Sequence, residues 1–165
     1  MKSHFQMMAR YNRWANARLY DAAAGLPDDL YRKDIGLFFR SVHGTLNHLV
    51  ATDRIWMRRL DGAGDAPDRL NAILFEDLAA LREARKTEDE RIVRFVEGVS
   101  EGDLEGVRDY KTTRGVSQRD PLRNILAHLF NHQTHHRGQA HTGLSQLTGA
   151  EPPPLDLLAM MREKA

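Results

Sequence analysis

HLFNHQTHHRGQ, residues 128–139, places four histidines within nine positions and lies inside a longer helical pattern. Because a helix turns by about 100° per residue, one face is shared by positions 122, 125, 126, 129, 133, 140, 144 and 147. This face consists mainly of leucine and isoleucine, and it predicts a long helix, packed against a core, that ends at about Gly149. Asp120 is expected to cap its start, with Pro121 in the first position.

The histidines of this helix fall on different faces. His136 lies within the apolar face and His132 at its margin, whereas His128 and His135 lie outside it. His132 and His136 are four residues apart, so their side chains stack one turn apart and can offer two imidazole nitrogens to one cation. Two ligands alone bind weakly, and a third ligand must come from another element.

Apolar residues recur with helical spacing in three other parts of the chain, over residues 2–24, 41–62 and 74–99. Ser41 is expected to cap the second of these helices, which ends at Gly62. In the third, the run REARKTEDER, residues 82–91, is interpreted as a solvated helix face with paired charges. The segments around Pro27-Asp28-Asp29 and at residues 61–68 are predicted loops.

Two smaller elements are expected near the C-terminus. The segment GVRDYKTTRGVSQRDP, residues 106–121, permits a short β-hairpin centred on TTRG. After three consecutive prolines, LDLLAMMREK, residues 155–164, predicts a short helix that packs on the body through Leu155, Leu158, Ala159 and Met161. The sequence therefore predicts one all-α domain over residues 1–165, a bundle of four long helices with these two additions.

His48 is the candidate third ligand. It lies inside the helix predicted over residues 41–62, where an unpaired polar ring would be costly. His43, in the first turn of that helix, is more easily left in water, and with His4 and His141 it is assigned an ordinary hydrogen-bonded or surface role. Asp53 follows His48 by about 140° around the helix, so we expect it to contact a neighbouring helix or brace the site rather than share the ion.

The charge, the cysteine content and the hydropathy of the chain exclude several classes of partner and of site. The chain has 24 basic and 23 acidic residues and a net charge of +1, which favours neither nucleic acid nor an anionic membrane as partner. It has no cysteine, which excludes disulfides, thiolate nucleophiles and cysteine-ligated metals. The absence of a long apolar run and of a secretion signal predicts a cytoplasmic protein.

Three segments of the chain stand out together: YNRWAN at 11–16, SVHGTLNHLVATDRIWMRRLDG at 41–62, and HLFNHQTHHRGQ at 128–139. In this order they resemble the DinB family of metalloproteins, which is unrelated to the DNA polymerase of that name. The resemblance implies an up-down-down-up four-helix bundle with a long crossover, a metal held by three histidines near one end, and a homodimer. Carried over by position, it assigns His48, His132 and His136 as the metal ligands.

The HRGQ part of the motif adds Arg137 and Gln139. Contact with substrate, bracing of the ligands and pinning of neighbouring helices all remain open for these two residues, and we favour a structural or bracing role.

Three neutral imidazoles with an open fourth position are typical of a catalytic zinc site. The resemblance adds thiol-dependent S-transfer and hydrolysis as reactions. Our first hypothesis is a divalent-metal-dependent enzyme acting on a small molecule, such as a low-molecular-weight thiol, with metal-bound water or thiolate as nucleophile. The alternatives are a metal-dependent hydrolase, a non-catalytic, damage-inducible metal-binding stress-response module, and nickel binding that arises only in purification. Zinc or nickel suits such a site, but the ligand type does not identify the native ion.

Overall fold

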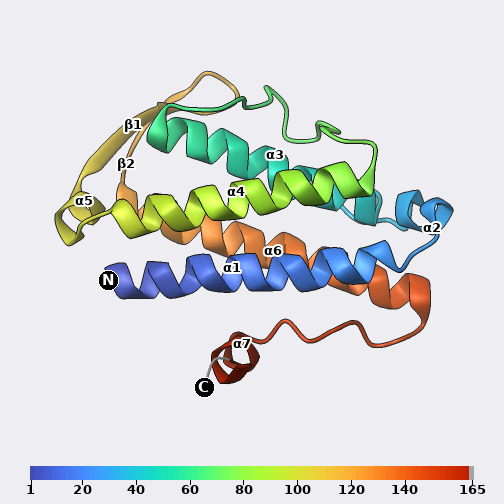
Figure 1. The fold of residues 1–165 in the computed structure, drawn as a ribbon. Coiled ribbons are helices and arrows are strands. Elements are labelled where there is room, and N and C mark those ends of the chain that lie inside the picture. The colour runs from blue at the N-terminus through green and yellow to red at the C-terminus, as the bar shows by residue number, and fades with distance from the viewer. Residues whose placement is uncertain (164–165) are drawn as a thin grey trace.

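The computed structural model of the protein describes residues 1–163, which form a mainly helical fold with a small antiparallel sheet (Figure 1). The elements are α1 (Lys2–Ala24), α2 (Asp28–Arg32), α3 (Val42–Asp61), α4 (Leu78–Gly98), α5 (Glu101–Glu105), β1 (Val107–Lys111), β2 (Ser117–Pro121), α6 (Leu122–Thr148) and α7 (Leu157–Glu163).

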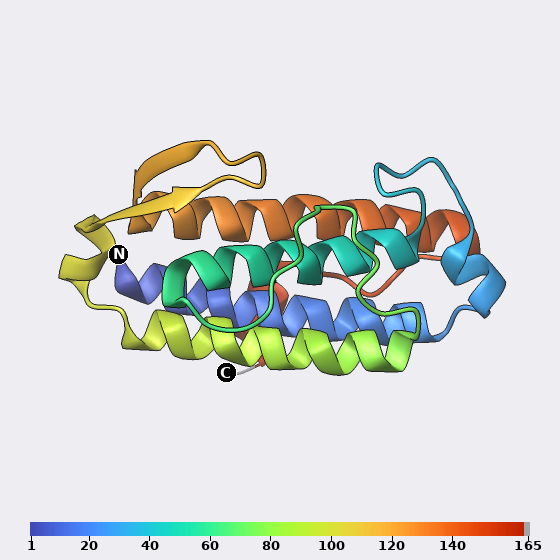
Figure 2. The same ribbon diagram turned by 90° about the horizontal axis from the view of Figure 1, so that it is seen from above.

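The four longest helices lie side by side (Figure 2), with α1 in contact with α4 and α6, and α3 in contact with the same two. Helices α1 and α6 run in one direction and α3 and α4 in the other (Figure 1). The predictions of a mainly helical protein, a hairpin before the last long helix and a short C-terminal helix are confirmed. No helix within residues 1–163 is both long and apolar enough to span a bilayer.

The ends of α3 follow the sequence prediction. The Ser41 side chain accepts a hydrogen bond from the Gly44 amide at 3.0 Å and so caps the helix. Gly62 ends the helix in the left-handed region, at φ 74°, where a residue without a Cβ is favoured.

The predicted start of α6 is wrong in detail. Asp120 does not cap the helix, because it belongs to β2 and accepts a hydrogen bond from the Tyr110 hydroxyl at 2.8 Å. Pro121 is the residue that precedes the helix, and no side chain caps it. The hairpin therefore uses the carboxylate that the sequence pattern assigns to the helix.

Within residues 1–163, two apolar clusters lie between the long helices, one toward each end, and a third packs Met160 of α7 against α1. The first includes Phe5, Met57 and Leu126, and the second includes Leu19 and Leu46. A polar layer separates them at the middle of the long helices, and its members are Asn12, Asn16, Asp53, Arg85, Asp89, Gln133 and Arg137.

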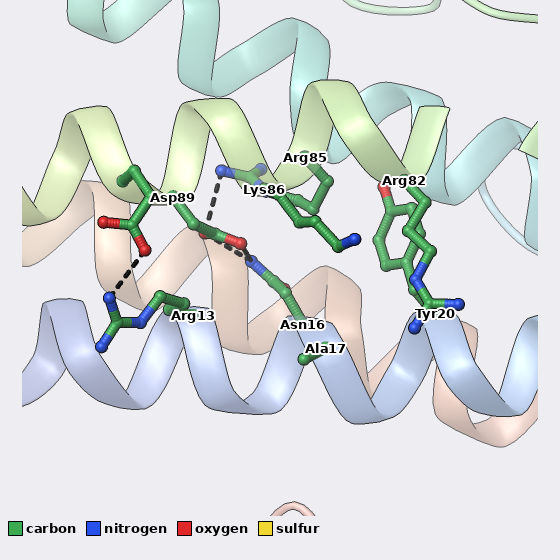
Figure 3. A pocket seen from close by; sticks show the side chains of 9 residues that line it. Arg13, Asn16, Ala17, Tyr20, Arg82, Arg85, Lys86 and Asp89 are labelled. Atoms are coloured by element: carbon green, nitrogen blue, oxygen red, sulfur yellow. Dashed lines mark hydrogen bonds and ion pairs between the residues drawn. The ribbon is translucent and has the colours of Figure 1, made fainter. Parts of the chain in front are cut away.

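This polar layer corrects the interpretation of residues 82–91 as a solvated face, because Arg85, Glu88 and Asp89 are buried. Arg85 Nη1 lies 2.7 Å from Asp53 Oδ2, and its Nη2 lies 3.0 Å from Asp89 Oδ1. Asn16 of α1 donates to Asp89 at 2.9 Å, so Arg85, Asp89 and Asn16 meet between α1 and α4 (Figure 3).

Other residues of the same run, such as Lys86, are exposed and paired as expected. The partners of the buried charges come from α1 and α3, and spacing within α4 alone does not reveal them.

Three smaller expectations differ from the structure. Residues 28–32 form the short helix α2 instead of a loop. Helix α4 begins only after Asp77, which caps it, so Leu74 packs on the core from the preceding segment. On α7 the buried residue is Met160, whereas Leu158 and Met161 are exposed; Lys164, the end of the predicted helix, lies outside the described residues.

Candidate metal centre

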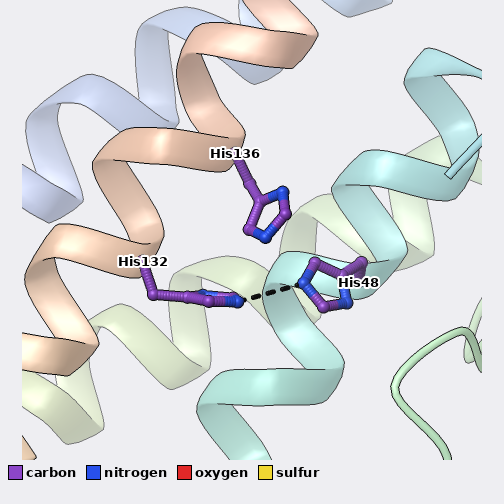
Figure 4. A group of neighbouring side chains, drawn as sticks. All are labelled: His48, His132 and His136. Carbon is purple, nitrogen blue, oxygen red and sulfur yellow. Dashed lines mark hydrogen bonds between the residues drawn. The ribbon is translucent and has the colours of Figure 1, made fainter. Parts of the chain in front are cut away.

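Three histidines converge between α3 and α6 (Figure 4). His48 of α3 and His132 and His136 of α6 each offer a ring nitrogen, and these atoms all lie within 4.8 Å of one another. The Nε2 atoms of His48 and His132 are 3.2 Å apart. His48 and His136 are buried and His132 is half-buried. The structure brings together all three residues selected from the sequence, and we call them the histidine triad.

Two members of the triad are oriented by oxygen acceptors. His48 Nδ1 lies 2.7 Å from the Leu70 carbonyl oxygen in the segment between α3 and α4. His136 Nδ1 lies 2.7 Å from Gln139 Oε1, one turn further along α6. A carbonyl oxygen only accepts, so Nδ1 carries the proton in both rings and Nε2 keeps its lone pair. Metal-binding histidines commonly donate the other ring N–H to an oxygen acceptor in this way.

The triad is neutral at physiological pH. Burial lowers the pKa of His48 to about 4, with a smaller opposing effect of its hydrogen bond to Leu70. Burial and the neighbouring histidines lower the pKa of His132 to about 3. Burial likewise lowers the pKa of His136. Metal ligation requires neutral imidazoles, so these rings need not lose protons before they bind an ion near pH 7.

The donor set fits a borderline divalent cation. The three donors are imidazole nitrogens and the group contains no carboxylate, which suits zinc or nickel better than magnesium or calcium. Asp53 lies against Arg85 of α4, as expected from its position on the helix. A cavity of about 270 Å³ opens above the triad and is lined also by Phe38, Phe39 and Leu70.

The remaining histidines lie outside the triad. His141 contacts the Pro153 carbonyl oxygen at 3.1 Å, and His4 and His135 are exposed. His128 is also exposed, with its ring against Trp56. His43 has the hydrogen-bonded role expected of it, but it is buried rather than left in water, because the segment before α4 folds over the start of α3 and brings the Phe75 carbonyl oxygen to 3.1 Å from its Nε2.

Two residues of the HRGQ motif, Arg137 and Gln139, form hydrogen bonds with other side chains of the protein. Arg137 is buried and donates to Asn12, which joins α6 to α1. Gln139 orients His136. Both positions match the bracing role favoured from the sequence.

Sequence reasoning missed two parts of the site. The Phe39 ring stacks on the His48 imidazole, with centroids 3.7 Å apart and planes at 19°. Leu70 acts through its backbone carbonyl. Both come from irregular segments, where side-chain periodicity carries no signal.

Comparisons with known proteins agree on one family. The model of the DinB family matches residues 1–164. Protein DinB of Bacillus subtilis (strain 168) is 24% identical over 149 residues, which cover 87% of this chain and 86% of that protein. The crystal structure of a DinB-like protein from Bacillus cereus ATCC 10987 superposes with a TM-score of 0.65 at 18% identity, covering 85% of this chain and 89% of that one.

Proposed function

The chain belongs to the DinB family, and from this premise we propose that it is a divalent-metal-dependent enzyme that acts on a small molecule, with His48, His132 and His136 as the metal ligands. The observation that carries the proposal is the convergence of three neutral imidazoles whose ligand nitrogens lie within 4.8 Å of one another beneath an open cavity. A three-histidine site with room for a further ligand is the arrangement of catalytic rather than structural zinc.

A divalent ion held there would supply Lewis acidity, which lowers the pKa of water or of a thiol and polarises a carbonyl group. The chain's own residues prepare the site. The Leu70 carbonyl and Gln139 hold the protons of two rings on Nδ1, which directs both Nε2 lone pairs into the site. Phe39 covers one face of His48 and keeps water from that ring.

We propose thiol-dependent S-transfer as the reaction. A neutral site without a carboxylate base suits a thiol, because a thiol ionises more readily than water and needs less help from a general base. Hydrolysis and a non-catalytic metal-binding role are the competing functions, and the same experiment addresses them.

The test uses untagged protein that has not passed over a nickel column. Metal-free and zinc- or nickel-loaded protein would be incubated with 2-mercaptoethanol plus 1-chloro-2,4-dinitrobenzene, and separately with 4-nitrophenyl acetate. We expect metal-dependent thioether formation that is lost in His132→Ala and retained in the control His4→Ala, whose ring is exposed on α1 and does not line the cavity. Metal-dependent ester cleavage alone would favour the hydrolase, and no metal-dependent turnover would favour the binding module.

We propose further that the arrangement of helices is the up-down-down-up four-helix bundle implied by the resemblance. The opposite directions of the pairs α1/α6 and α3/α4 support this, as does the long segment that crosses from the end of α3 to the start of α4 (Figure 1). A homodimer is part of the same proposal, and sedimentation velocity of the untagged protein tests it.

A further inference from the structure

We propose that the substrate carries an uncharged apolar group, preferably an aromatic ring, that packs against Phe38 and Leu70 while its reactive polar group faces the histidine triad. This inference rests on the proposed function, because it places the substrate in the cavity above the triad. It adds the chemical class of the substrate and the residues that select it.

The cavity has an apolar rim and a polar floor. Phe38 enters it from the segment between α2 and α3, and Leu70 from the segment between α3 and α4. None of the eight lining residues is a lysine, an arginine or a carboxylate. At the rim, away from an ion held by the triad, a charged substrate body would lose water without meeting a charged side chain, whereas an apolar body would not incur that cost. The volume of about 270 Å³ lies just below the usual range for small-molecule sites, about 300–1,000 Å³, which suits a small substrate.

The two adjacent phenylalanines have different roles. Phe39 is already engaged, because one face covers His48 and its ring also meets His136 edge-on at 5.5 Å between centroids. Phe38 packs edge-on against Phe39 at 4.9 Å, and 78% of its surface is exposed. Leu70 is 46% exposed. An exposed aromatic ring beside a polar site offers apolar surface that a ligand can cover.

The segment that carries Phe38 is held in place. Arg40 adopts a left-handed conformation, with φ 71°, which costs a residue with a side chain about 1 kcal/mol or more. Its carbonyl accepts from the Ile35 amide at 2.9 Å, and its side chain pairs with Asp34 at 2.8 Å. Strained backbone held by several contacts is a feature of ligand sites, and a rigid wall loses little entropy when a ligand binds.

Gly44 completes this arrangement. A Cβ at this position would collide with the Phe39 carbonyl oxygen. Glycine in the first turn of α3 therefore allows the segment to lie directly against the helix that carries His48.

The test compares two thiols that differ in apolar surface. Cobalt-loaded, untagged protein would be titrated with phenylmethanethiol and with 2-mercaptoethanol, and binding followed through the thiolate-to-cobalt charge-transfer absorption. We expect the wild type to bind phenylmethanethiol about tenfold more tightly, as burial of a small apolar area predicts. Phe38→Ala should weaken phenylmethanethiol binding by about three- to tenfold and leave 2-mercaptoethanol and cobalt binding unchanged. Leu158→Ala, an exposed apolar side chain on α7, is the matched control and should change neither.

A second readout does not need the metal. In metal-free protein, saturation-transfer NMR should show contact between the protein and the ring of phenylmethanol, and this contact should weaken in Phe38→Ala. Ring contact without any cobalt–thiol absorption would support the packing of an apolar group against Phe38 and Leu70. It would contradict the thiol reaction proposed above.

Equal affinity for the two thiols in the wild type, or an unchanged ring contact in Phe38→Ala, would overturn the inference and leave the proposed metal site intact. A lower sedimentation coefficient for Phe38→Ala, with thiol preference unchanged, would also overturn it, because the ring would then belong to a contact between two copies of the chain.

Discussion

Replacing Arg85 with methionine should lower the free energy of unfolding by about 3–5 kcal/mol, the usual cost of removing one partner from a buried ion pair. The Arg85 side chain is 2% exposed, and the carboxylates beside it, on Asp53 and Asp89, are 1% and 4% exposed. Methionine keeps much of the length and apolar stem of arginine. The expected loss therefore comes from two carboxylates left in the core without their cation.

The two carboxylates should contribute unequally. Asp89 keeps hydrogen bonds from Asn12 and Asn16, whereas Asp53, whose Oδ2 lies 2.7 Å from Arg85 Nη1, keeps only Gln133 as a neighbouring side-chain donor among residues 1–163. Asp53 should thus account for most of the loss. Adding Asp53→Asn to Arg85→Met removes that buried charge and should recover part of the stability.

The loss should also depend on pH. Burial raises the pKa of Asp53 and of Asp89, and Arg85 opposes this effect in both. Without Arg85 the folded-state pKa values rise further above those of the unfolded chain. The folded variant then binds protons that the unfolded chain releases, so its stability decreases as pH rises above about 4. The difference from wild type should be smaller at about pH 5 than at about pH 8.

Urea unfolding of metal-free proteins, followed by circular dichroism, measures these differences. Lys86→Met is the matched control, because the neighbouring side chain is 58% exposed and its loss should change stability by less than about 0.5 kcal/mol. Two results would contradict the buried ion pair: a cost of Arg85→Met no larger than that of Lys86→Met at about pH 8, or a double variant less stable than Arg85→Met alone.

Three further perturbations address the triad and its support. Gly44→Ala should cost about 1–3 kcal/mol because the new Cβ collides with the Phe39 carbonyl oxygen; thermal unfolding measures this, and an unchanged melting temperature would contradict the close approach. Ser41→Ala removes the cap of α3 at the Gly44 amide and should cost about 1 kcal/mol in urea unfolding, whereas wild-type stability would mean that the cap contributes nothing. Lowering the pH should destabilise the metal-free protein, because imidazoles in the unfolded chain bind protons near about pH 6.5, whereas those of His48 and His132 do so only near about pH 4 and pH 3 in the folded state. This stability is present above pH 6.5 and lost as pH falls through those values, so a flat profile between about pH 7 and pH 4 would contradict the buried, neutral rings.

The histidine triad could be selected from the sequence because its geometry is local to two helices. His132 and His136 are one turn apart on α6, and His48 is a polar ring at an interior position of α3. The contact between α3 and α6 then brings the three rings together. The boundaries of α1 and α3 were also predictable, since each depends on signals within a few residues.

The residues that sequence reasoning misplaced depend on contacts between distant segments. Arg85 and Asp89 are inward-facing only because α1 and α3 supply their partners. His43 is buried by a segment that follows it by about thirty residues in the chain. Asp120 serves the hairpin rather than the helix. In each case a contact with a residue far away in the chain determines the position of the side chain, and the local spacing of residues does not reveal that contact.

Zinc K-edge X-ray absorption of untagged, zinc-loaded protein identifies the atoms that bind the ion. We expect one zinc ion per chain with three imidazole nitrogens at about 2.0–2.1 Å, and a loss of imidazole scattering in His48→Ala. A first shell of oxygen atoms alone, or a spectrum unchanged in His48→Ala, would contradict it.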